Sequence, residues 1–113
     1  MAHIIPLSDL SLSHRAAQFE GGKYDTTISF FVTRHGAGEG PSPHRHPYAE
    51  TFIVQEGAGV FTVDGDEIPV DAGNVVVVPA GAAHSFKGAG SGTLGMVSIH
   101  AAPEMVTEWL EEE

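Results

Sequence analysis

The sequence contains no cysteine and few basic residues, and these two absences exclude several classes of protein. Without cysteine the chain has no disulfide framework, no thiolate metal site and no cysteine nucleophile. Only 5 Lys and Arg stand against 15 Asp and Glu, so the formal net charge is −10. Such a surface repels phosphate backbones and anionic lipids, and we therefore expect neither nucleic acid nor a membrane as a partner.

Long hydrophobic runs are also missing. No apolar stretch approaches the ~20 residues that span a bilayer. The first residues, Met1 to Pro6, have neither the basic start nor the apolar stretch of a signal peptide. We expect a soluble cytoplasmic protein, and the length of 113 residues predicts one domain over residues 1–113.

Glycine and proline are abundant, with 14 and 7 copies, and they separate short runs rich in β-branched and aromatic residues. The pattern predicts an all-β sandwich or small barrel over about residues 25–100. A hairpin is expected at Asp64-Gly65, because this pair suits a type I′ turn. Pro69 has no amide to donate, so we expect its strand to be an edge strand or a bulged one. The expected strands cover residues 25–35, 49–55, 60–63, 66–70, 75–78, 84–87 and 93–100.

Near the end of the chain, the spacing of the apolar residues changes from that of a strand to that of a helix. Met105 and Trp109, and likewise Val106 and Leu110, repeat four residues apart among glutamates. This spacing predicts a short amphipathic C-terminal helix over residues 104–112 that packs onto the barrel.

The histidines carry the chemistry. His44 and His46 are two residues apart, so both project from one face of an extended strand. Glu50 keeps the same parity, and Phe52 continues it, which makes this the interior face. His84 follows the Pro79-Ala80-Gly81 turn. Three imidazoles and one carboxylate form a plausible site for a divalent metal, with imidazole suiting Zn, Cu, Fe and Ni and the carboxylate extending the choice to Mn.

These residues lie in two spaced motifs. The first is Gly38, five residues, His44-x-His46, three residues, Glu50, six residues and Gly57. The second is Gly73, five residues, Pro79-x-Gly81, two residues and His84. Together they resemble the two motifs of the cupin superfamily, in the compact spacing of a small single-domain cupin. One position differs from the second motif of the family, because Gly88 stands where the family usually has Asn.

The resemblance implies a jelly-roll β-barrel, also called a double-stranded β-helix, and a homodimer. It also implies that His44, His46, Glu50 and His84 bind one divalent ion per chain, which can be Mn, Fe, Ni, Zn or Cu. Four protein ligands leave an octahedral ion two positions for water, dioxygen or substrate, as in a catalytic site. A divalent ion with one glutamate has a formal charge of about +1, which favours an enolate, a carboxylate or a phenolate.

Other residues are candidates by parity and position alone. The expected substrate pocket contains Phe31, Phe52, Phe86 and Met96. Tyr48 is a candidate for orienting substrate, and His100 for an acid or base over the site; the alternatives are simple packing and a strand-end histidine bonded to backbone. No cluster of basic residues is expected on the inner face. We expect surface positions for His3, His14 and His35.

Two classes of function remain. The first is a metal-dependent enzyme on a small enol, phenol or carboxylate, with a dioxygenase-like oxidoreductase favoured and isomerase and cyclase reactions open. The second is a non-catalytic module that binds or senses a small ligand through a metal anchor. Open coordination favours the enzyme.

Overall fold

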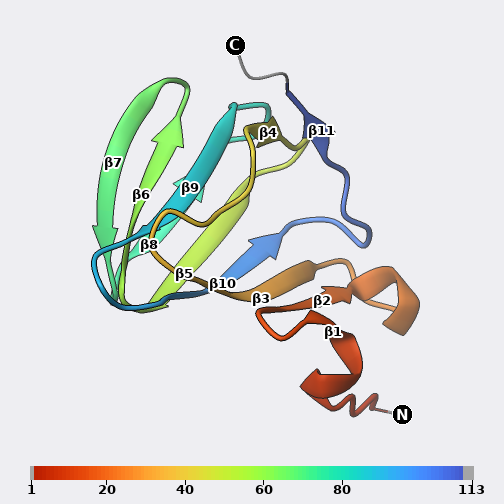
Figure 1. Cartoon of the computed structure of the whole chain (residues 1–113). Helices are drawn as coiled ribbons and strands as arrows, with labels where there is room; N and C mark the ends of the chain where they lie inside the picture. The colour runs from red at the N-terminus through yellow and green to blue at the C-terminus, as the bar shows by residue number, and fades with distance from the viewer. Residues whose placement is uncertain (1, 111–113) are drawn as a thin grey trace.

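The computed structural model describes residues 2–110, and nearly all of its regular structure is β-strand (Figure 1). Two short 3₁₀ turns occur near the N-terminus, at Leu7–Leu10 and Gly21–Tyr24. Across residues 2–110 we find no helix of the length and hydropathy needed to cross a bilayer. The strands are β1 (Ser11–Ser13), β2 (Ala16–Glu20), β3 (Ser29–His35), β4 (His44–Arg45), β5 (Glu50–Glu56), β6 (Ala58–Val63), β7 (Asp66–Asp71), β8 (Val75–Val78), β9 (His84–Ala89), β10 (Leu94–His100) and β11 (Glu108–Trp109).

The strands form two antiparallel sheets. One has the order β1-β2-β3-β10-β5-β8, and the other has the order β11-β4-β9-β6-β7. Their inner faces enclose a core of buried apolar side chains, which includes Phe52, Phe61, Leu94 and Met96. Burial alternates along β5 with period two, so that Glu50, Phe52 and Val54 face inward. This confirms the all-β jelly-roll architecture and the interior parity.

Local turn chemistry agrees with the sequence prediction. Asp64 and Gly65 have φ values of 48° and 88° between β6 and β7, as a type I′ hairpin requires. Pro69 lies on β7, at the edge of its sheet. No second strand on that side needs the amide hydrogen that proline lacks.

Two parts of the chain differ from expectation. Before residue 25, β1 and β2 extend the six-stranded sheet, because β2 pairs with β3 from Ala16↔Thr33 to Glu20↔Ser29. The predicted C-terminal helix is wrong: residues 104–110 contain no helix, and β11 within them pairs with β4. A helix this short is marginal by itself, so tertiary hydrogen bonds decide the conformation. Residues 111 and 112 of the expected helix lie outside the described part of the chain.

Gly88, the departure from the cupin pattern, has a steric cause. A Cβ atom at this position would lie 2.3 Å from the carbonyl oxygen of Gly36 and 2.8 Å from that of His35. The loop after β3 crosses here, with hydrogen bonds from Gly38 N–H to Gly88 O and from Gly88 N–H to Glu39 O. Only glycine allows this close approach of two backbones.

Candidate metal centre

Two cross-strand pairs, one in each sheet, assemble the site. His44 on β4 lies opposite His84 on β9 in the five-stranded sheet. Glu50 on β5 lies opposite His100 on β10 in the six-stranded sheet. Opposite residues in antiparallel strands have Cβ atoms about 5 Å apart, so each pairing sets two functional side chains next to each other. The site therefore lies between the sheets, where both pairs face inward.

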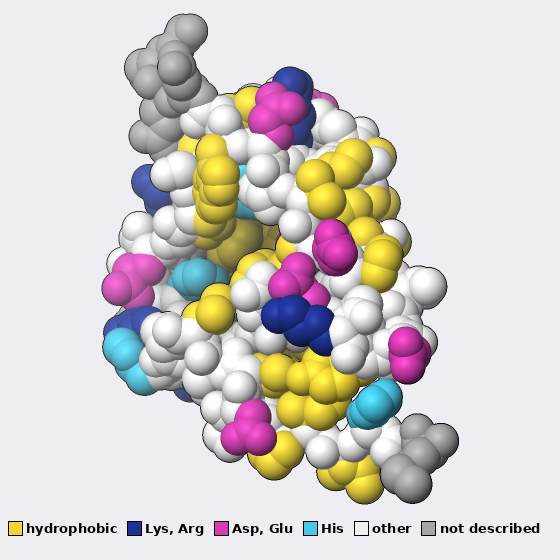
Figure 2. Space-filling view, turned by 90° about the vertical axis from the view of Figure 1, so that its right-hand side faces the viewer, with side chains coloured by type: hydrophobic (Ala, Val, Ile, Leu, Met, Phe, Trp, Pro, Cys, Tyr) yellow, Lys and Arg dark blue, Asp and Glu magenta, His cyan; other side chains and the backbone are white. Residues whose placement is uncertain are grey.

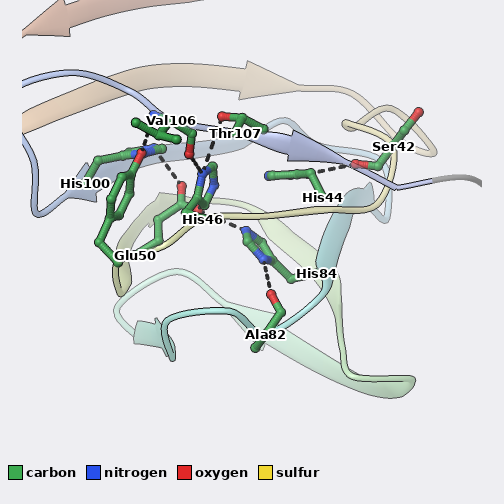
Figure 3. Close-up of polar contacts among 10 residues, drawn as sticks. Ser42, His44, His46, Glu50, Ala82, His84, His100, Val106 and Thr107 are labelled. Atoms are coloured by element: carbon green, nitrogen blue, oxygen red, sulfur yellow. Dashed lines mark hydrogen bonds and ion pairs between the residues drawn. The ribbon is translucent and has the colours of Figure 1, made fainter.

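The predicted ligands meet in one buried cluster. One nitrogen or carboxylate oxygen from each of His44, His46, Glu50 and His84 lies within 4.8 Å of all the others. All four side chains are buried, and the imidazoles of His46 and His84 both approach Oε1 of Glu50 (Figure 3). Metal–ligand bonds of about 2.1 Å set neighbouring ligand atoms about 3 Å apart. The cluster could hold a metal ion.

The ligand imidazoles share one tautomer. Nδ1 of His44 lies 2.7 Å from Ser42 O, that of His46 lies 2.8 Å from Val106 O, and that of His84 lies 2.9 Å from Ala82 O. Since a carbonyl oxygen only accepts, each Nδ1 carries hydrogen and donates it. In the neutral ring, each Nε2 then has a free lone pair, which is the arrangement of a metal-ligating histidine with an oriented ring.

This arrangement needs a cation. Nε2 of His46 and Nε2 of His84 each lie 3.0 Å from Oε1 of Glu50. In neutral rings these contacts set lone pairs against a carboxylate oxygen, and Nε2 of His46 has no aligned hydrogen-bond partner within residues 2–110. Protonating every ring instead would place several positive charges within van der Waals range of one another. A divalent ion between these atoms satisfies them all, and the residues present therefore fit the metal that the cupin motifs imply.

The pKa directions follow the same geometry. Burial would raise the pKa of Glu50, but the close approach of the His100, His46 and His84 imidazoles outweighs it and holds that pKa well below its usual range. Burial would lower the pKa of His46, yet contacts with Glu50 and the Val106 carbonyl raise it overall. For His44, burial dominates and lowers the pKa. The cluster thus combines an ionised carboxylate with imidazoles that differ in proton affinity.

His100 has the opposite tautomer. Its Nε2 lies 3.0 Å from Oε2 of Glu50, and its Nδ1 lies 2.6 Å from the Tyr48 hydroxyl. That hydroxyl accepts a hydrogen bond from Val106 N–H, which leaves its own hydrogen for Nδ1 of His100. Hydrogen on Nε2 then faces the carboxylate. His100 contacts side chains rather than backbone, and it borders the candidate ligand Glu50 without offering a lone pair to the metal.

The C-terminal segment (residues 104–110) supports the site from outside. Val106 contacts both His46, through its carbonyl, and Tyr48, through its amide. Met105 N–H binds the carboxylate of Glu20, and Leu110 N–H binds Pro43 O. Figure 1 shows β11, at the end of this segment, beside β4, and Figure 3 shows Val106 and Thr107 next to His46. The segment therefore fixes two groups of the site although it contains no ligand.

A cavity of about 460 Å³ opens next to the cluster. On the face shown in Figure 2, hydrophobic side chains surround a hollow with histidine at its edge. The expected pocket residues divide: Phe31 and Phe86 line the cavity, whereas Phe52 and Met96 do not and are 0% and 1% exposed in the core. His100 also lines the cavity, and Tyr48 stands behind it. The volume suits a small organic molecule.

Several lining residues were not predicted from the sequence. His35, expected on the surface, packs edge-to-face on Phe86 at 5.0 Å, and burial lowers its pKa. His3 and His14 are exposed as expected. Arg15 and Arg34 also line the cavity, but each forms an ion pair with a glutamate, Glu39 and Glu56 respectively. Trp109 contributes an aromatic wall.

Fold and site together define a small double-stranded β-barrel with a His₃Glu cluster at its open end. The model of the Cupin domain family matches residues 30–100, and the chain therefore belongs to the cupin domain family. The match begins on β3 and ends at His100, so it includes all four candidate ligands.

Two curated relatives match part of the chain. A polyketide synthase, CurC, of Streptomyces cyaneus is 36% identical over 67 residues, covering 58% of this chain and 43% of that protein. A dimethylsulfoniopropionate lyase, DddW, of Ruegeria pomeroyi is 34% identical over 53 residues, covering 47% of this chain and 35% of that protein. The matched segment thus spans less than half of either relative.

Solved structures share the fold at lower identity. A cupin-like protein of Thermotoga maritima superposes with a TM-score of 0.75 at 20% identity, covering 84% of this chain and 74% of that one. A mutant oxalate decarboxylase of Bacillus subtilis superposes with a TM-score of 0.79 at 22% identity, covering 92% of this chain and 31% of that one. At these identities the likeness establishes the architecture only.

Proposed function

We propose that this protein is a metal-dependent enzyme that acts on a small carboxylate, enol or phenol. The observation that carries the proposal is the cluster of His44, His46, Glu50 and His84, of which all but His84 line a cavity of about 460 Å³. When bound there, a divalent ion would supply Lewis-acid polarisation of a substrate oxygen and, if redox-active, reactivity towards dioxygen.

The protein's own groups would orient the substrate and move a proton. Phe31 and Phe86 provide apolar walls that exclude water from the ligand cluster. His100 lines the cavity, bonds Tyr48 and contacts Glu50. Nδ1 of His100 faces the Tyr48 hydroxyl and Nε2 faces Glu50, so His100 would pass a proton between these two groups at the edge of a bound substrate. This is the arrangement of a general acid or base oriented by a third group.

The names of similar proteins support an enzyme of this type. They include an oxalate oxidase and an oxalate decarboxylase among the structures, and a dimethylsulfoniopropionate lyase and a polyketide synthase among the sequences. Oxalate and dimethylsulfoniopropionate are both carboxylates, which agrees with the positive charge that a divalent ion beside one glutamate would present. A dioxygenase-like oxidation is the favoured reaction if the resident metal is redox-active.

The second candidate is a binding module with a metal anchor. It is favoured by the aromatic lining, which would hold a small ligand with or without chemistry. The Tyr48–His100–Glu50 chain of contacts favours the enzyme, because a purely binding site has no need of a coupled proton donor and acceptor.

A two-stage experiment separates these functions. Elemental analysis of protein purified without added metal identifies the ion. The protein loaded with that ion is then incubated with oxalate and other small carboxylates, enols and phenols, with and without dioxygen. Turnover that is lost in His44→Ala supports the enzyme. Ligand binding that raises the melting temperature without any product supports the module and contradicts the proposal.

A further inference from the structure

We infer that Trp109 is a specificity-determining residue that selects ligands with a planar, unsaturated ring beside their oxygen group. The inference rests on the proposed function, because it concerns what occupies the cavity next to the metal cluster. It adds a residue outside the two cupin motifs and a narrower class of ligand.

The indole of Trp109 is held next to the cluster. Its ring centroid lies 4.9 Å from that of His44, one of the candidate ligands, and Trp109 pairs with His44 between β11 and β4. The neighbouring residues anchor it on both sides. Glu108 forms a 2.6 Å ion pair with Arg45, and Leu110 N–H binds Pro43 O. The backbone that carries the indole is therefore held next to His44 before any ligand arrives.

The side chain of Trp109 is nevertheless largely exposed to solvent. Trp109 is 63% exposed, although a tryptophan that packs only for stability is usually well buried. It lines the cavity together with Phe31 and Phe86, so the exposed indole and two phenyl rings border the same space. An exposed indole on a held strand has only two side-chain torsions and therefore loses little conformational entropy on binding, which is how rigid aromatic anchors increase affinity.

The geometry favours a small molecule as the occupant. Residues that share the cavity with Trp109 include His44, His46, Glu50 and His100, so a molecule on the indole reaches the cluster as well. A carboxylate or other oxyanion would be directed to the cluster, and its attached ring would lie among the aromatic walls. Ring pairs of this kind add about 2- to 10-fold in affinity beyond the area that they bury.

The test uses two carboxylates of matched size, benzoate and cyclohexanecarboxylate, which differ in the planarity of the ring. Their affinities for the full, metal-loaded chain are measured by calorimetry in the wild type, Trp109→Leu and Trp109→Phe. Metal content is determined for each sample. Val77→Ala, which changes an exposed apolar residue that does not line the cavity, is the control.

We expect the wild type to prefer benzoate, and Trp109→Leu to weaken benzoate about 3- to 10-fold while changing cyclohexanecarboxylate by less than about twofold. Trp109→Phe should retain most of the preference, and Val77→Ala all of it. Equal losses for both probes, or no loss for either, would overturn the inference, since the indole would then serve packing or a protein partner. Absence of benzoate binding in metal-loaded wild type would overturn it too, while turnover assays would still decide the proposed function.

Discussion

The Tyr48 hydroxyl lies 2.6 Å from Nδ1 of His100, and this contact gives His100 a tautomer different from that of the three ligand histidines. Those three donate from Nδ1 to backbone carbonyls and turn Nε2 towards Glu50 or the cluster. His100 instead receives hydrogen at Nδ1 and turns an N–H towards Glu50. The cluster thus contains lone pairs for a metal and, beside them, one imidazole with a separate role.

Removing the Tyr48 hydroxyl should separate these roles. Tyr48→Phe leaves Nδ1 of His100 without its donor and should reduce the free energy of unfolding by about 1–2 kcal/mol. Metal content should stay unchanged, because no ligand atom is lost, while turnover should fall about 100-fold if His100 moves a proton. Urea unfolding, elemental analysis and initial rates provide the three measurements.

Tyr24→Phe is the matched control, since Tyr24 packs against Phe19 at 5.2 Å, away from the site. It should leave stability within about 0.5 kcal/mol and activity unchanged. Loss of metal in Tyr48→Phe with none in Tyr24→Phe would mean that Tyr48 supports the ligands rather than the proton chain.

Acidification should weaken metal binding, because protons compete with the metal for the ligand imidazoles. Metal requires unprotonated Nε2 atoms, and the pKa of His46 is raised from its ordinary value in the metal-free protein. Proton competition therefore begins above about pH 6.5 and grows as pH falls towards about pH 5. Glu50 stays ionised throughout this range, because its pKa is held well below the usual one, so the loss comes from the imidazoles.

Competition with a chromophoric chelator measures this affinity at each pH. We expect a fall of at least about tenfold between about pH 8 and about pH 5. The same affinity at both ends of the range would argue against histidine ligation.

Gly88 should not tolerate the residue that cupins usually have there. Gly88→Asn places a Cβ against the backbone of Gly36 and should reduce the free energy of unfolding by about 1–3 kcal/mol. Gly92→Asn is the control, because nothing lies within 4 Å of a Cβ at that position. Similar urea midpoints for the two variants would show that the loop after β3 does not cross β9 this closely.

Metal binding should be visible in the fluorescence of Trp109. It is the only tryptophan in the chain, and its ring lies 4.9 Å from that of His44. Titrating metal-free protein with Ni²⁺, a paramagnetic ion, should quench the emission and saturate near one ion per chain. Glu108→Gln, which removes the charge that pairs with Arg45 but keeps the indole, should still show the quenching. Emission that Ni²⁺ leaves unchanged would place the ion elsewhere.

The ligand cluster was predictable because it depends on local geometry. The spacing of His44 and His46 fixes their shared face, and the parity of Glu50 fixes its direction, so neither requires knowledge of the fold. The Asp64-Gly65 hairpin was predictable for a similar reason, since two φ values decide it. His84 was a candidate from its residue type and its place after the Pro79-Ala80-Gly81 turn, and the resemblance to cupins then linked it to His44, which no local pattern does.

Contacts between distant segments were not predictable from periodicity. The same spacing of Met105 and Trp109 that predicts a helix also occurs in an extended segment, and the hydrogen bonds from Val106 to His46 and Tyr48 decide between them. His35 was placed on the surface because nothing near it in the sequence indicates Phe86. Parity correctly placed Phe52 inside, but it could not distinguish core from cavity wall.

Elemental analysis of matched variants tests the central claim most directly. Wild type and His14→Ala, which changes an exposed histidine, should each contain close to one divalent ion per chain after purification. His100→Ala should keep its ion, whereas His44→Ala should fold and lose most of it, to below about a tenth of an ion per chain. An ion content in His44→Ala equal to that of the wild type would contradict the account.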